Sequence, residues 1–417
     1  MEATPTSAIA PARISVIVVS RGRPEALARC LMGLAQLDHP AFEIVVVADP
    51  SGLAATAPWA GRIKALAFDE ANISAARNLG VGAAAGEVLA FIDDDAVPEP
   101  LWLAHLGGAF ADRRVACAGG FVRGADGLSW QWRAREVMGD ASSRPLAVDA
   151  RAVTVLTPAP GRATRTEGTN MAVRAGVLRG LGGFDAGYRF WLDETDLNWR
   201  LARAGHATAI VPLAEVHHGA LESDRRRADR VPRSLCEVGA SLAVWARRHG
   251  PAPGRLDAER AERRRSLLGH MVAGRIEPGC VGRLLATLDE GHAEGRARDL
   301  PPLAPLAASE AAFLPFRADP PRRGHVVLAA TPWGARAARA EAARHAAAGA
   351  PVTLLVLWRT ARPHRATLLA QGVWVQEGGL WGPSERTDPR LRPWRRAARV
   401  AREAHRLEAV RGPALAP

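Results

Sequence analysis

Hydrophobic residues in the first half of the chain follow two spacings. Short runs rich in valine and isoleucine predict buried strands, and apolar positions three and four residues apart predict amphipathic helices between them. The predicted strands cover residues 14–20, 42–49, 61–68, 87–93, 115–122 and 207–219, the last ending in a turn, and the predicted helices cover residues 23–37, 73–86 and 101–111. This alternation predicts an α/β fold with a mainly parallel sheet and helical crossovers.

Two residues mark predicted helix boundaries. Pro24 suits the first turn of its helix, because that position needs no amide donor and proline already holds a helical φ. Gly86 is expected to end the helix over residues 73–86, since glycine adopts the left-handed conformation that commonly closes a helix.

The pattern changes near residue 222. A charged linker is followed by two or three arginine-rich amphipathic helices up to about residue 298, and then by a proline-rich linker. A strand, an alanine-rich helix and a second strand over residues 325–358 predict one small α/β unit, and an arginine-rich helix is expected over residues 388–410. The predicted organisation is a leader (1–12), a first domain (13–222), a helical extension (223–299), a linker (300–321) and a small α/β unit (322–417).

Charge is distributed unevenly along the chain. The formal net charge is +12, Lys64 is the single lysine, and the first 120 residues are net acidic while the remainder is strongly basic. Such a basic half suits anionic lipid head groups, nucleic acid or phosphorylated sugars, or it consists of solvated arginine-rich helices. Of these partners we expect peripheral contact with an anionic membrane and no nucleic acid.

Apolar segments long enough for a transmembrane helix do not occur, and the run Ile14–Val19 is too short for the hydrophobic part of a signal peptide. The four cysteines are far apart and lack the spacing of a zinc site, so we expect reduced thiols. These features predict a cytoplasmic protein, with contact at most to the inner face of the membrane.

Three consecutive carboxylates, Asp93, Asp94 and Asp95, follow the fourth predicted strand. Ser20 and Asp49 also stand at the ends of predicted parallel strands, and ligands of such sheets bind beyond those ends. A carboxylate cluster there binds a divalent cation, forms an acid and base pair, or makes a solvated turn. A cation such as Mg²⁺ prefers oxygen ligands and would relieve the repulsion within the cluster.

A second acidic group, Asp193, Glu194 and Asp196, is framed by apolar residues. A carboxylate in a partly apolar cleft can have a raised pKa and act as a general base, whereas the helix dipole alone also favours acids in a first turn. His217 and His218 close a predicted strand, where an imidazole completes a metal site or is merely structural. Both interpretations stay open for each group.

Several motifs occur in an order that resembles one enzyme family. They are the serine and Arg-Pro after the first strand, the aspartate after the second, NISAARNLGVGAAAGEVLAFIDDDAVP, GTNMAVRAGVLRGLGGFD, LDETDLNWRLARAG and HHG. Over residues 13–220 this order resembles the inverting family 2 glycosyltransferases, which have the GT-A fold. The resemblance implies a nucleotide-diphosphate-sugar transferase that uses Mn²⁺ or Mg²⁺.

The resemblance also implies which residues bind the donor. The nucleotide sugar would contact Ser20, Arg23, Asp49, Arg77, Asn78, Asp93 and Asp94. Asp49 stands in VADPSG, where the family often has two acids before Gly-Ser, and Gly22 replaces the family's usual asparagine. Arg77 suits a phosphate, the acidic cluster or a plain helix surface.

Metal, base and acceptor residues follow from the same resemblance. Asp95 would bind the metal together with His217 or His218. Glu194 occupies the position of the catalytic base, with Asp193 as the alternative because the order of the acids departs from the family's usual one. The acceptor side would hold Asn170, which also suits a buried turn, and Asp196, which also suits orienting the helix.

The implied reaction moves a sugar from a nucleotide-diphosphate donor to a hydroxyl of a glycan or lipid-linked acceptor, with inversion at the anomeric carbon. The family's common setting implies cell-envelope or exopolysaccharide synthesis. Two other functions stay open. One is a nucleotidyltransferase, although SRGRPEAL is a poor phosphate loop, and the other is a non-catalytic protein that binds a nucleotide sugar or glycan on the same fold. The sequence TPWGARA lacks GxGxxG, so no dinucleotide site is expected in the small α/β unit.

Overall fold

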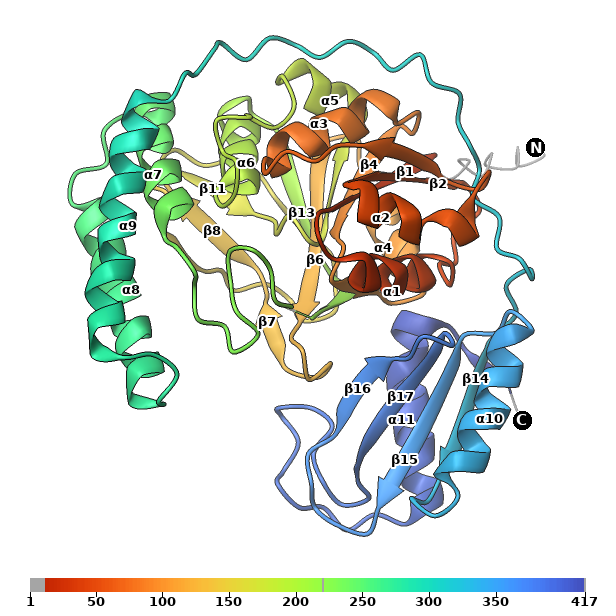
Figure 1. The fold of residues 1–417 in the computed structure, drawn as a ribbon. Coiled ribbons are helices and arrows are strands. Elements are labelled where there is room, and N and C mark those ends of the chain that lie inside the picture. Colours follow the sequence, from red (N-terminus) through yellow and green to blue (C-terminus); the bar gives the residue numbers. More distant parts are fainter. Residues whose placement is uncertain (1–11, 220, 416–417) are drawn as a thin grey trace.

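The computed structural model describes residues 12–219 and 221–415. The predicted leader, residues 1–12, therefore lies outside the described residues except for Ala12. Figure 1 shows a large α/β domain, a helical segment on one side of it, and a small α/β unit at the carboxyl end of the chain. The predicted fold class is confirmed.

The large domain is built on one mixed sheet. Its strands, in spatial order, are β3 (Lys64–Ala67), β2 (Phe42–Ala48), β1 (Ile14–Ser20), β4 (Val88–Asp93), β12 (Met171–Arg174), β6 (Val115–Arg123), β13 (Ala207–His218) and β10 (Thr154–Leu156), with β5 (Ala96–Pro98) beside β13 and β7 (Trp130–Trp132) beside β6. The strands β1 to β4 are parallel, β12 is antiparallel to both β4 and β6, and β13 is parallel to β6. The carboxyl ends of β1, β2, β4, β6 and β13 therefore meet at one edge of the sheet.

Helices cover both faces of this sheet (Figure 1). They are α1 (Pro24–Leu34), α2 (Pro50–Ala55), the 3₁₀ turn η1 (Ala57–Trp59), α3 (Ile73–Ala83), α4 (Trp102–Ala109), α5 (Ala175–Gly180) and α6 (Asp193–Arg203). Val16 and Val18 share a core with Leu27 of α1, whereas Ile17 shares a core with Val81 of α3 on the other face. Burial on both faces explains why β1 is hydrophobic at nearly every position.

One of the two predicted helix boundaries is confirmed and the other is wrong. Pro24 stands in the first turn of α1 as predicted. The helix α3 ends at Ala83 rather than at Gly86, and Gly86 does not have a left-handed φ. A Cβ at Gly86 would lie 2.5 Å from the backbone nitrogen of Ser15. Close packing at the start of β1, and not helix capping, therefore requires this glycine.

A three-stranded sheet and three helices extend the large domain beside α6. The sheet consists of β11 (Arg162–Arg165), β8 (Arg135–Met138) and β9 (Ser143–Pro145), and the helices are α7 (Cys236–His249), α8 (Arg255–Val272) and α9 (Pro278–Ala297). Trp245 of α7 packs with Trp199 of α6 at a ring-centroid distance of 5.7 Å. The helical segment therefore shares a core with the helix that carries the second acidic group.

The linker after α9 has no regular structure but is held to the large domain. The backbone nitrogen of Leu314 donates to Glu43 Oε2 at 2.8 Å, and the Phe316 ring packs on Phe42 at 5.3 Å between centroids. A hollow of about 420 Å³ beside the linker is lined by Phe42, Phe316 and Arg322. Because Phe42 begins β2, this hollow lies at the edge of the sheet opposite to Asp93.

The small α/β unit has a five-stranded sheet with one long helix on either side in Figure 1. In spatial order the strands are β16 (Arg365–Leu368), β17 (Val373–Gly379), β15 (Val352–Trp358), β14 (His325–Ala330) and β18 (Ala414–Leu415), and the helices are α10 (Ala335–Ala347) and α11 (Arg396–Arg411). The tail helix begins at Arg396 rather than at residue 388, because Pro393 favours an extended backbone before it. Across the described parts of the chain, no helix has both the length and the hydropathy needed to cross a membrane.

Candidate active site

Two aspartates and one histidine gather at the carboxyl edge of the central sheet. Asp93, Asp95 and His218 each offer one ligand atom, and these atoms lie within 4.8 Å of one another. Two carboxylates and an imidazole are a donor set that fits Mn²⁺. They fit Mg²⁺ less closely, because Mg²⁺ prefers oxygen ligands. Burial raises the pKa of Asp95, but the hydrogen bond and charge of His218, with the charge of Arg23, lower it overall. Asp95 is therefore ionised at neutral pH, the state that a metal ligand requires.

The pairing of β5 with β13 decides which histidine joins this cluster. His218 stands opposite Ala96 and His217 opposite Val97, and side chains alternate between the two faces of a strand. His218 Nε2 lies 3.2 Å from Asp95 Oδ1, whereas His217 Nε2 lies 2.8 Å from Glu99 Oε1. The structure thus brings His218 to the aspartates and takes His217 away from them. Of the two ligands left open by the sequence, His217 is corrected to a partner of Glu99.

The tilt of the His218 ring is set by residues that the motifs did not include. Its Nδ1 lies 3.1 Å from Gln131 Oε1 on β7, and its ring stacks near Trp132 at 5.4 Å between centroids. When Nδ1 carries the proton, it donates to Gln131 and leaves Nε2 free as a metal ligand. Such a partner commonly fixes the tautomer of a metal-binding histidine.

Asp94 points away from the cluster and anchors the aspartate turn. Ser20 Oγ donates to Asp94 Oδ2 at 2.7 Å, and Arg23 Nε donates to the same oxygen at 3.1 Å. Arg23 also reaches Asp95 Oδ2 at 3.2 Å. Burial raises the pKa of Asp94 to about 7 against the opposing effect of Arg23. Three consecutive carboxylates coexist because the middle one is turned inward to a serine and an arginine.

Two further predicted donor-binding residues stabilise backbone turns. Asp49 caps the N-terminus of α2 and accepts hydrogen bonds from the backbone of Gly52 at 3.1 Å and from Ser51 Oγ at 2.7 Å. Asn78 donates to Phe184 O at 2.7 Å and accepts from Phe184 N at 2.8 Å. Asn78 therefore holds the glycine turn before Phe184, and a role in nucleotide binding stays a prediction for both residues.

Arg77 joins the two acidic groups across the site. Its guanidinium forms an ion pair with Asp193 and lies 3.2 Å from Asp93 Oδ1. Arg77 is only 4% exposed, so the interpretation as a plain helix-surface arginine is wrong. Arg77 thus links the first acidic group, at Asp93, with the second, at Asp193.

The second acidic group begins α6 after a strained turn. Trp191 and Leu192 both have φ of +66°, a left-handed conformation that costs roughly 1 kcal/mol or more for such residues. Their turn places Asp193 and Glu194 in the first turn of α6, where both side chains are buried. The buried side chain of Leu192 and the helix dipole offset part of this strain.

Asp193 and Glu194 have different neighbouring arginines, and their pKa values differ. Burial raises the pKa of Asp193 to about 8, with Arg77 opposing and the neighbouring Glu194 adding to the rise. Burial also acts on Glu194, but Arg165 and a hydrogen bond from Asp193 lower its pKa overall. Arg165 Nη2 donates to Glu194 Oε1 at 2.7 Å and to Glu167 Oε2 at 3.1 Å. At neutral pH the pair therefore shares one proton, held mainly by Asp193.

Three arginine or acid side chains in this site were missed by the sequence reasoning. Arg165 ends β11 and Glu167 follows it, in and beside a stretch that had no clear periodicity. Arg226 lies in the charged segment after β13, half-buried, and its Nε meets no hydrogen-bond partner among the described residues. Burial and the like charges of Arg230 and Arg23 lower the pKa of Arg226, while Asp95 raises it. The signal for Arg226 was the RRR run, which the sequence alone could not place near the aspartates.

The predicted acceptor residues are engaged elsewhere. Asn170 is fully buried: its amide donates to Phe121 O at 2.9 Å and Ala214 O at 2.7 Å, and accepts from Trp102 Nε1 at 2.8 Å. These are the contacts of the buried-turn alternative. The acceptor role of Asn170 is thus unsupported by its contacts.

Asp196 is likewise turned into the protein. Its carboxylate accepts from Arg200 Nε at 2.8 Å and lies 2.8 Å from His249 Nε2 of α7. Burial and these cations leave the pKa of Asp196 lowered overall. This side chain orients α6 against α7, which is the alternative that the sequence left open.

Comparison with known proteins adds independent information. Residues 15–189 match the sequence model of the family described as glycosyl transferase family 2. Two curated relatives, both named pre-mycofactocin glycosyltransferase, come from the CDC 1551 / Oshkosh and H37Rv strains of Mycobacterium tuberculosis and are 28% identical over 180 residues. The match covers 42% of this chain and 35% of each relative, so the chain spans about a third of their length.

Solved structures of two glycosyltransferases are also similar. One is GalNAc-T7 with UDP, GalNAc and Mn²⁺, at 18% identity and a TM-score of 0.43, over 58% of this chain and 49% of that chain. The other is the mannosyltransferase PcManGT from Pyrobaculum calidifontis with GDP-Man and Mn²⁺, at 17% identity and a TM-score of 0.41, over 71% of this chain and 78% of that chain. Residues 15–189 are therefore similar to a glycosyl transferase family 2 domain, and this region makes up less than half of the chain.

Proposed function

We propose that this chain transfers a hexosyl-type sugar from a nucleotide-diphosphate donor to an acceptor hydroxyl, with inversion at the anomeric carbon. The observation that carries the proposal is the position of Arg77, which contacts Asp93 of the ligand cluster and Asp193 of the acid pair. Asp93, on one side of the Arg77 guanidinium, would help to stabilise the leaving group. The acid pair on its other side would activate the acceptor. Residues 13–222 are the proposed transferase domain, followed by the helical extension (223–299), the linker (300–321) and the α/β unit (322–417).

The leaving diphosphate would be held at the aspartate turn. A divalent cation bound by Asp95, Asp93 and His218 would supply Lewis-acid stabilisation of the diphosphate oxygens. Arg226 supports the same assignment, because a half-buried guanidinium beside Arg23 and Arg230 is a cluster of like charges that an anion would neutralise. Ser20 and Asp49 would shape the pocket for the nucleoside.

The proton of the acceptor hydroxyl would pass to Glu194. The acceptor oxygen forms a bond to the anomeric carbon as the bond from that carbon to the diphosphate oxygen breaks, and the carboxylate of Glu194 takes the hydroxyl proton. Attack from the face opposite to the diphosphate inverts the configuration. Arg165 keeps Glu194 ionised, and Arg77 fixes Asp193 beside it.

A donor screen tests this function directly. The purified protein is incubated with a panel of nucleotide sugars with Mn²⁺, Mg²⁺ or EDTA, and nucleotide-diphosphate release and thermal shift are recorded. We expect one donor to give metal-dependent release that Asp95→Asn abolishes, because the substitution removes a charged metal ligand. Donor binding without release on addition of acceptor extracts would favour the non-catalytic binding protein, and no response to any donor would contradict the proposal.

The acceptor side of the proposal includes contact with an anionic membrane and a glycan or lipid-linked acceptor of cell-envelope or exopolysaccharide synthesis. Support comes from the carboxyl edge of the small sheet, where Trp333 is 96% exposed and Leu391 is 62% exposed. Exposed arginines at the same edge, none with a carboxylate partner among the described residues, are Arg336, Arg359, Arg362, Arg390, Arg392, Arg395 and Arg396. Exposed tryptophan amid arginines suits the interface of an anionic bilayer.

Vesicle flotation measures this contact. We expect the protein to float with vesicles that contain phosphatidylglycerol, and the double variant Arg390→Gln/Arg395→Gln to lose more than half of the floated fraction. The matched control, Arg264→Gln/Arg265→Gln on α8, removes the same charge from another exposed surface and should float as the unchanged protein does. Equal loss in both variants would mean that net charge, and not this edge, attracts the protein.

A further inference from the structure

The small α/β unit contacts the family 2 domain directly behind the aspartate turn. Glu99 follows β5, four residues after Asp95, and is 2% exposed. Arg411, the last residue of α11, donates from Nε to Glu99 Oε2 at 2.7 Å and from Nη2 to Glu99 Oε1 at 2.8 Å. Arg411 is also 2% exposed. A residue outside the matched family region thus forms a two-pronged buried ion pair with the domain.

The partners of this ion pair come from both sides of the contact. His217 Nε2 lies 2.8 Å from Glu99 Oε1, on the domain side. From the small unit, Arg411 Nη1 donates to Thr353 Oγ1 at 2.6 Å, and the Arg411 guanidinium lies 4.3 Å from the centre of the Trp374 ring. The same ring lies 4.8 Å from the His217 ring. Glu99 is therefore enclosed, and without Arg411 its charge would lack its main compensation.

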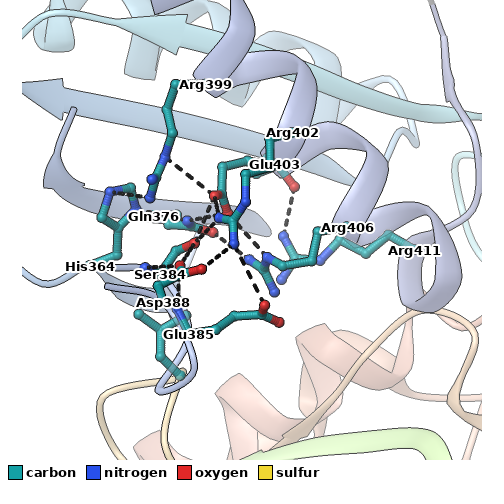
Figure 2. A network of polar contacts seen from close by, with 12 residues as sticks. His364, Gln376, Ser384, Glu385, Asp388, Arg399, Arg402, Glu403, Arg406 and Arg411 are labelled. Carbon is teal, nitrogen blue, oxygen red and sulfur yellow. Dashed lines mark hydrogen bonds and ion pairs between the residues drawn. The ribbon is translucent and has the colours of Figure 1, made fainter. Parts of the chain in front are cut away.

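The helix that carries Arg411 is itself firmly held. Figure 2 shows a buried network around Glu403 of α11. Glu403 is fully buried and accepts from Gln376 of β17 at 3.0 Å and from Ser384 Oγ at 2.7 Å, while Arg402 and Arg406 pair with its carboxylate. These contacts hold α11 firmly against its own sheet. When the small α/β unit moves, Arg411 therefore moves with it.

The position of Glu99 is coupled to the metal ligands by one short ladder. β5 connects Asp95 to Glu99, and it pairs with β13 so that Ala96 stands opposite His218. His217, which contacts Glu99, is the chain neighbour of His218. A displacement of Glu99 is therefore passed along β5 to Asp95 and through His217 to His218. It would change the distance between the side chains of Asp95 and His218.

We propose that the small α/β unit positions the metal ligands of the family 2 domain, with Arg411 as the positioning residue that acts through Glu99 and His217 on Asp95 and His218. This inference rests on the proposed metal site. It assigns a function to residues 322–417, which the family match does not cover.

An exposed ion pair within the small α/β unit provides a matched control. Arg339 of α10 pairs with Glu377 of β17, and both side chains are nearly half exposed. Replacing Arg339 by methionine removes one arginine and one ion pair of the small unit. Neither Arg339 nor Glu377 contacts Glu99 or Arg411 through a hydrogen bond or ion pair among the described residues.

The experiment compares Mn²⁺ affinity and metal-free stability of the full-length protein and its variants. Mn²⁺ binding is measured by titration with electron paramagnetic resonance detection, and stability by thermal unfolding in EDTA. We expect Arg411→Met to weaken Mn²⁺ binding about 10-fold or more, in the range typical of residues that orient metal ligands. Arg411→Lys should be intermediate, because a single ammonium cannot reproduce the two-pronged contact. Arg339→Met should change the Mn²⁺ affinity less than about twofold even where it lowers the Tm.

The results decide whether the small α/β unit positions the metal ligands or only docks on the large domain. If Arg411→Met binds Mn²⁺ as tightly as the unchanged protein, the proposal is wrong, whatever the Tm. If Arg411→Met does not fold, the double variant Glu99→Gln/Arg411→Met removes the uncompensated charge. This double variant must then fold and bind Mn²⁺ weakly, and normal affinity in it overturns the proposal. An unchanged protein that fails to bind Mn²⁺ would instead refute the proposed metal site.

Discussion

At the scale of single residues, neighbouring arginines give two adjacent carboxylates different pKa values. Asp193 has a pKa raised to about 8 by burial, whereas Arg165 keeps Glu194 ionised. We therefore expect Glu194→Gln to lower kcat by about 10²-fold to 10⁴-fold, the usual contribution of a general base. Asp193→Asn resembles the protonated acid and should lower kcat at pH 7 less than about tenfold. Steady-state kinetics with the donor found in the screen measure both.

The pH dependence provides the control for this assignment. Because the pKa of Asp193 lies near 8, Asp193 loses its proton between pH 7 and 9, and kcat of the unchanged protein should change over that range. The change should be absent in Asp193→Asn. A larger loss in Asp193→Asn than in Glu194→Gln at pH 7 would assign the base to Asp193 instead.

At the scale of elements, two glycines near the end of α3 are expected to respond oppositely to alanine. Gly86 has no room for a Cβ, which would lie 2.5 Å from Ser15 N, so Gly86→Ala should lower the free energy of unfolding by about 1–3 kcal/mol. Gly82 is exposed within α3, with no atom within 4 Å of an added Cβ. Gly82→Ala should raise the free energy of unfolding by about 0.5–1 kcal/mol. Urea denaturation measures both changes.

The sign of the two changes is the critical result. Destabilisation by both substitutions would mean that the end of α3 tolerates no added side chain, and the close approach to β1 would then not be special to Gly86. Stabilisation by both would mean that β1 and the segment before β4 move apart at little cost.

At the scale of the whole molecule, mild acid between pH 7 and 5 should weaken the small α/β unit. Burial, and then the charge of Arg411, lower the pKa of His325 from 6.5 to about 4. Between these values the unfolded chain binds more protons than the folded one, so stability falls as the pH falls from about 6.5 to 4. For His325 alone we expect a loss of about 2 kcal/mol between pH 7 and 5, measured by urea denaturation at each pH.

Two substitutions separate this effect from general acid sensitivity. His325→Gln should reduce the loss between pH 7 and 5 by about 2 kcal/mol. The loss that remains comes from other groups such as His364, whose pKa burial also lowers to about 4. His405 lies on the exposed face of α11, and His405→Gln should leave the dependence unchanged. An unchanged slope in His325→Gln would show that other groups determine acid stability.

The sequence determined the parts of this protein that depend on local pattern. Continuous apolar runs are required of strands buried on both faces, so β1, β2 and β4 could be placed within a residue or so. Parallel strands bring their carboxyl ends to one edge, so Ser20, Asp49 and Asp93 could be assigned to a common site before any contact was known. Gly86 was singled out as a helix end, which is wrong, because a close approach between residues 71 positions apart leaves no local signal.

Only the tertiary structure decided how the chemical groups meet. The ladder between β5 and β13 turns His218 toward Asp95 and His217 toward Glu99, a choice that two adjacent histidines in a sequence cannot express. Long-range packing likewise brings Arg165 to Glu194 and Arg411 to Glu99. The physical reason is that strand pattern is a property of neighbouring residues, whereas the pairing of buried charges depends on the register and docking of segments far apart in the chain.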